Sequence, residues 1–110
     1  MITTKVARRI TVVLDAALKD LVFEKVQSLG ACCFHYMEVN GQGLHAVTGD
    51  PYSGDGLLRM EIVTTQETGA KLLDWIHAAQ FAQLSHYALF AFADNVEVDE
   101  RDQSITKVRS

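Results

Sequence analysis

The chain has 110 residues, of which 48% are hydrophobic and 22% charged, and its formal net charge is -4. This length fits one domain of ordinary globular composition. The acidic balance argues against general affinity for nucleic-acid backbones, which requires clustered cations. No apolar run approaches the roughly 18 residues that a membrane span needs, and the first nine residues lack the apolar stretch of a signal peptide. We therefore expect a cytoplasmic protein that is not inserted in a membrane.

The first predicted elements are a strand and a helix. Residues 9–14 are dominated by β-branched side chains, which favour a strand, and Asp15 can cap the helix that follows. One apolar face of that helix is predicted from the spacing of Leu18, Leu21, Val22, Val26 and Leu29. Gly30 stands where helices commonly end in a left-handed turn.

The middle of the chain predicts a strand and then a long loop. Residues 31–39 form the strand, in which Phe34, Tyr36 and Met37 fit either face of a mostly buried sheet. Residues 41–56 hold five of the seven glycines and the only proline. Loops longer than about 12 residues inside a compact domain are usually functional or disordered.

The second half repeats the pattern. Residues 57–63 predict a third strand, and Thr64 and Glu67 have the spacing of a capping box. The helix that follows has Gly69 in its first turns, where glycine weakens helix propensity, and it turns apolar residues inward at Leu72, Leu73, Ile76 and Ala79. Residues 87–98 predict a fourth strand.

This order of elements predicts an α+β fold of the ferredoxin-like βαββαβ type, with two helices on one face of an antiparallel sheet. We expect a single domain over residues 1–110, with its core at about 9–98 and a polar tail at 99–110. The segment 88–93 is apolar on both sides, so the sheet face without helices is expected to be covered by other copies of the chain.

Side chains that could carry metal or catalytic chemistry are sparse. No two histidines have the i, i+4 spacing of a helical metal site, although His35 and His45 flank the base of the loop. Cys32 and Cys33 are adjacent, so they point to opposite faces of a strand and a bond between them is not expected. Asp50 and Asp55 lie in a glycine-rich loop that offers no rigid placement for an acid/base pair. We predict no catalytic residues, no metal site and no enzyme activity.

Two further features have structural interpretations. The run Gly41-Gln42-Gly43 has two glycines of a phosphate-cradling turn, but no third glycine, following helix or lysine accompanies it. Trp75 lies close to the Leu72/Ile76 stripe of the second helix, which favours a core or oligomer contact.

The pattern resembles the PII-like signalling proteins, and most closely the branch associated with bicarbonate transporters and carboxysomes. The resemblance rests on the order and spacing of short stretches, namely Gly30-Ala31 with Met37, Gly41-Gln42-Gly43, residues 60–64, residues 69–76, Tyr87-Ala88 and residues 96–98. The loop at 41–56 corresponds to the T-loop of that family.

The resemblance implies a cytoplasmic homotrimer that binds adenine nucleotides, with bicarbonate as a further ligand, in clefts between subunits. It implies regulation of a partner, a membrane transporter, through the T-loop. By carry-over, the implied ligand-binding residues are the T-loop base (Gly41, Gln42, Gly43), the adenine side (Glu61, Ile62, Val63, Thr64) and the segment before the last strand (Ser85, His86, Tyr87). No other cofactor is implied.

The sequence departs from the family pattern in two places. Residues 82–87 replace the Thr-Gly-x-x-Gly-Asp-Gly-Lys run of the nitrogen-sensing members, and Leu44-His45-Ala46-Val47 stands where the transporter-associated branch often has arginines. We therefore assign phosphate recognition to other cations, namely Arg59, Lys107 and Arg109, with His45 when protonated. The alternative function is a metal-responsive trimer of the same fold that uses His35, His45 and Cys33.

Overall fold

The computed structural model describes residues 2–31, 33–39, 56–81 and 87–101. Its elements are β1 (Thr4–Asp15), a short 3-10 turn (Ala16–Leu18), α1 (Lys19–Ser28), β2 (Cys33–Val39), β3 (Leu57–Thr64), α3 (Gln66–Phe81) and β4 (Leu89–Asp99). Neither α1 nor α3 is long and apolar enough to cross a membrane, and the same holds for every helix in the described residues.

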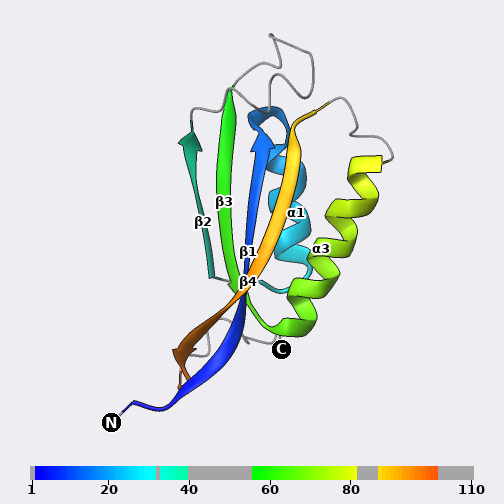
Figure 1. The fold of residues 1–110 in the computed structure, drawn as a ribbon. Coiled ribbons are helices and arrows are strands. Elements are labelled where there is room, and N and C mark those ends of the chain that lie inside the picture. The colour runs from blue at the N-terminus through cyan, green and yellow to red at the C-terminus, as the bar shows by residue number, and fades with distance from the viewer. Residues whose placement is uncertain (1, 32, 40–55, 82–86, 102–110) are drawn as a thin grey trace.

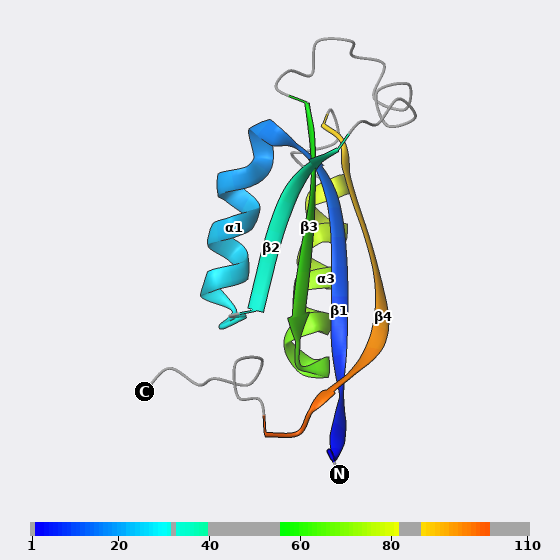
Figure 2. The same cartoon turned by 90° about the vertical axis from the view of Figure 1, so that its left-hand side faces the viewer.

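The strands form one sheet in the order β2-β3-β1-β4, and every neighbouring pair is antiparallel. Both helices cover one face of this sheet, as the two views at right angles show (Figures 1 and 2). This arrangement confirms the predicted ferredoxin-like α+β fold.

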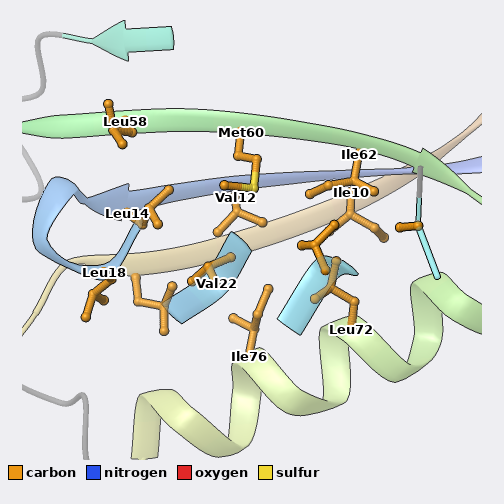
Figure 3. Close-up of a cluster of buried hydrophobic side chains, with 13 residues drawn as sticks. Ile10, Val12, Leu14, Leu18, Val22, Leu58, Met60, Ile62, Leu72 and Ile76 are labelled. Atoms are coloured by element: carbon orange, nitrogen blue, oxygen red, sulfur yellow. The ribbon is translucent and has the colours of Figure 1, made fainter. Parts of the chain in front are cut away.

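The core lies between the sheet and the two helices. The β1–β3 register places Ile10, Val12 and Leu14 opposite Ile62, Met60 and Leu58. Because alternate residues of a strand share a face, these side chains all point toward the helices, where they meet the buried residues of α1 and α3 (Figure 3). The helix residues of this cluster include Val22, Val26, Leu72 and Ile76.

Several local predictions are confirmed. The Asp15 carboxylate caps the 3-10 turn that leads into α1, since its Oδ1 accepts a hydrogen bond of 2.9 Å from the Ala17 amide. Gly30 adopts a positive φ of 84° after α1 ends. Trp75 packs against the core, and Lys25 Nζ of α1 lies 5.8 Å from its ring centroid.

Two local predictions are wrong. The cap of α3 is Thr65 and not Thr64: Thr65 Oγ1 accepts from the Thr68 amide at 3.1 Å, whereas Thr64 is the last residue of β3 and is buried. Leu21, expected on the inner face of α1, is exposed. The buried residues of this stretch are Leu18, Val22 and Val26, and Leu29 is partly buried against the core.

The strand boundaries also differ from those expected. β1 begins at Thr4, because residues 4–7 pair with β4 alone and form a two-stranded ribbon that projects beyond the sheet (Figure 1). Polar cross-strand bonds support the ribbon, such as Thr4 Oγ1 to Glu97 Oε1 at 2.6 Å. β2 is an edge strand, so Tyr36 and Met37 are about half exposed and not buried as expected.

Candidate ligand-binding site

The sheet face that carries no helix, which we call the open face, has an apolar half at β4. Phe90 and Phe92 are 47% and 46% exposed, and their ring centroids lie 5.7 Å apart. In the register they stand opposite Val13 and Thr11 of β1. Two neighbouring aromatic rings left half exposed on a sheet face form an apolar patch of the kind that marks interaction sites.

Charged side chains occupy the rest of the open face, both on β2 and β3 and further along β1 and β4. On β3, Arg59 Nη2 lies 3.2 Å from Glu61 Oε2, and His35 Nε2 of β2 lies 3.8 Å from Glu61 Oε1. Between β1 and β4, Arg9 makes a bidentate contact with Asp94 at 3.0 and 2.7 Å. The hydrogen bonds from Arg9 hold the pKa of the Asp94 carboxyl below its ordinary value.

One end of the sheet gathers the start of β3, the end of β1 and the residues before β4, and we call it the loop end. The Asp15 amide donates to the Ala88 carbonyl at 2.8 Å, and the Ala16 amide donates to the Gly56 carbonyl at 2.9 Å. Gly56 has a φ of 93°, a conformation that favours glycine. Gly56 and Ala88 therefore lie on either side of the end of β1.

The described members of the predicted ligand set fall into two groups. Tyr87 lies at the loop end and is partly exposed, and Arg59 is two residues from the start of β3. Glu61 and Val63 lie further along the open face, whereas Ile62 and Thr64 are buried on the helix side. At 3.3 Å per residue, the seven-residue step from Leu57 to Thr64 is about 23 Å. One copy of the chain therefore does not bring Tyr87 and Thr64 together.

The remaining predicted site residues lie outside the described residues: Gly41, Gln42, Gly43, His45, Ser85, His86, Lys107 and Arg109. Among the described residues, no three histidine, cysteine, aspartate or glutamate side chains are grouped in a way that could hold a metal ion. His35 faces Glu61, while the second histidine of the metal hypothesis, His45, is not described.

Sequence reasoning missed two features of this region. The Arg9–Asp94 pair depends on the register between β1 and β4, which no local pattern reveals. The second oxygen of Asp15 is buried without a hydrogen-bond partner among the described residues. The only sequence signal for it is an aspartate at a strand-to-helix junction, which capping already explained.

No protein-family model matches the chain, and no curated protein matches it. Solved structures, in contrast, match the chain over most of its length. A PII-like signalling protein of Thermus thermophilus is 23% identical, with a TM-score of 0.66 over 87% of this chain and 91% of that chain. CPII of Thiomonas intermedia bound to ADP and bicarbonate is 16% identical, with a TM-score of 0.74 over 91% of this chain and 95% of that chain. The same protein bound to ADP, AMP and acetate has a TM-score of 0.72, 16% identity and coverage of 90% and 94%.

These likenesses define the class of fold. The chain has the fold of the PII-like signalling proteins, and the resemblance drawn from its sequence is confirmed at that level. Within that class, the structures it resembles include CPII, described as a nitrogen regulatory PII-like protein.

Proposed function

We propose that this chain is a PII-like sensor that acts in the cytoplasm as a homotrimer and not as an enzyme. An adenine nucleotide, with bicarbonate as a further ligand, binds in clefts between the subunits. Binding changes the conformation of the loop at 41–56, and the loop regulates a membrane transporter.

The observation that carries this proposal is the likeness to CPII over nearly the whole of both chains. Solved structures of CPII include its apo form and forms bound to ADP, to AMP and to bicarbonate. Because identity is only 16%, the ligand is inferred from the shared architecture and not from matched contact residues.

The open face supports assembly. Phe90 and Phe92 are half exposed in the single chain, and packing open faces together would remove both rings from water. The separation between Tyr87 and Thr64 supports a site between copies for a different reason. A ligand that contacts both implied groups needs the loop end of one copy and the β3 end of another.

Arg59 is the described residue to which we assign phosphate binding. Its guanidinium is half exposed, and Glu61 holds it on the open face. A charge-assisted hydrogen bond to phosphate contributes roughly 1.5–3 kcal/mol. Arg59→Ala should therefore weaken adenine-nucleotide binding by about ten- to a hundredfold.

Calorimetric titration with AMP, ADP and ATP, with and without bicarbonate, tests the proposal. The control is Arg101→Ala, because Arg101 is also an arginine paired with a carboxylate, Asp99, but lies in the turn after β4. Equal binding by wild type and Arg59→Ala would refute the role of Arg59 alone. Absence of binding by wild type at millimolar nucleotide would refute the sensor function.

A further inference from the structure

The carboxylate of Asp15 is buried, and only one of its two oxygens has a hydrogen-bond partner among the described residues. Its exposed fraction is 0%. Oδ1 accepts from the Ala17 amide at 2.9 Å, whereas Oδ2 is buried and has no hydrogen-bond partner among the described residues. Such a group is costly to leave unpaired, because it has lost its water and gained nothing in exchange.

Capping does not account for the second oxygen. Serine and asparagine cap helices about as well as aspartate does, and either would avoid burying an unpaired charge. The cap therefore requires one acceptor oxygen at this position, whereas the aspartate has two.

The position of the carboxylate is the second observation. Asp15 is the last residue of β1, and it pairs with Leu57 at the start of β3. Its own amide is bonded to Ala88, and the next amide is bonded to Gly56. Asp15 therefore stands at the loop end, joined through the backbone to Ala88 and next to the residue that is joined to Gly56.

We propose that Asp15 Oδ2 accepts a hydrogen bond from the nucleoside part of the ligand, from a neutral hydroxyl or amino group. This inference rests on the proposed function. An anionic carboxylate repels phosphates but pairs strongly with O–H and N–H donors, so the base or the ribose faces Asp15 and the phosphates point away from it.

The burial of Asp15 sets a condition on this contact. The Asp15 side chain has no exposed surface in the single chain, so a donor reaches Oδ2 only after the residues that cover it shift. The backbone amides of Asp15 and Ala16 tie this position to Ala88 and Gly56, so such a shift is expected to be felt at both residues.

The test compares wild type with Asp15→Asn, which keeps the capping oxygen and replaces Oδ2 by a neutral amide group. The matched control is Asp20→Asn, at an exposed aspartate in the first turn of α1. We expect the melting temperature of free Asp15→Asn to be no lower than that of wild type, because an unpaired buried charge has been removed. We expect its affinity for AMP to fall by about ten- to a hundredfold, with no such loss in Asp20→Asn.

Ligand analogues identify the donor. IMP lacks the 6-amino group of AMP, and 2′-deoxy-AMP and 3′-deoxy-AMP each lack one ribose hydroxyl. One of the three should bind wild type more weakly than AMP does, and Asp15→Asn should not distinguish that analogue from AMP. If wild type and Asp15→Asn lose affinity equally with every analogue, the contact does not exist.

Other outcomes overturn the inference for identifiable reasons. A lower melting temperature of free Asp15→Asn would mean that Oδ2 already has a donor in the free chain. If Asp15→Asn no longer forms the oligomer, the hydrogen-bond donor to Oδ2 belongs to a neighbouring copy and not to the ligand. Unchanged AMP affinity would overturn the inference while leaving the sensor function intact, whereas failure of wild type to bind any nucleotide would overturn both.

Discussion

Arg9 and Asp94 form a bidentate ion pair across β1 and β4 on the open face. The pKa of Asp94 is lowered, chiefly by the hydrogen bonds from Arg9. A carboxyl whose pKa is lower in the folded than in the unfolded chain is protonated first in the unfolded chain. Its contribution to stability is complete above the unfolded pKa, near 4, and is lost as the pH falls through the folded value.

Asp94→Asn should therefore flatten the acid side of the stability profile. Urea denaturation between neutral pH and about pH 3 measures the free energy of unfolding, which we expect to fall less steeply below about pH 4 in the variant than in wild type. Asp20→Asn serves as the charge-matched control. Superimposable profiles for wild type and Asp94→Asn would show that the pair makes no contribution, as is true of many exposed ion pairs.

At the scale of elements, α3 packs against β1 at Gly69 without room for a side chain. A Cβ added there would lie 2.9 Å from Arg8 Cγ, 3.2 Å from Arg8 Cβ and 3.3 Å from Ile10 Cδ1. The two Arg8 atoms are at the root of the side chain and cannot move aside as its tip could. The glycine that weakens helix propensity is thus the residue that lets the helix pack on the strand.

Gly69→Ala should destabilise the protein, although alanine is the better helix former by about 1 kcal/mol. Overpacking costs roughly 1–3 kcal/mol, so we expect a net loss of about 1 kcal/mol in chemical denaturation. The same change in an Arg8→Ala background should cost less, because the nearest atom is gone. A stabilised Gly69→Ala single variant would contradict the packing argument.

The type and order of the helices and strands could be predicted from the hydrophobic periodicity of the sequence, because the alternation in β3 and the apolar stripe of α3 are local signals. Features that depend on contacts between residues far apart in the sequence could not be predicted in this way. The ribbon at Thr4–Ala7 is held by β4, far away in the sequence, and β2 is half exposed because it lies at a sheet edge. The cap of α3 moved by one residue to Thr65, because Thr64 pairs with Arg8 and stays in β3.

At the scale of the whole molecule, the open face is expected to be the surface on which copies meet. Phe92→Asp would place a charge on this face and should convert the proposed trimer to monomers, as measured by light scattering. Phe81→Asp is the control, since Phe81 is 87% exposed at the end of α3 and not on the sheet. Wild type that stays monomeric across micromolar concentrations would refute the assembly, and a trimeric Phe92→Asp would place the contact elsewhere.

The candidate site was less predictable than the fold. Alternation along β3 places Glu61 and Val63 on one face of the sheet and Ile62 and Thr64 on the other. This division can be predicted from the sequence once it is known which face is buried. The ion pair that holds Arg59 and the unpaired oxygen of Asp15 depend on side-chain placement, which no spacing in the sequence reveals.

The central claim is that an adenine nucleotide binds between copies of this chain. Calorimetric titration of wild type and of Phe92→Asp with ADP tests it most directly. We predict saturable binding to wild type with one nucleotide per chain, and much weaker binding to the monomeric variant, because each site needs residues of two copies. Failure of wild type to bind at millimolar ADP would contradict the claim, and equal binding by monomer and oligomer would contradict its intersubunit site.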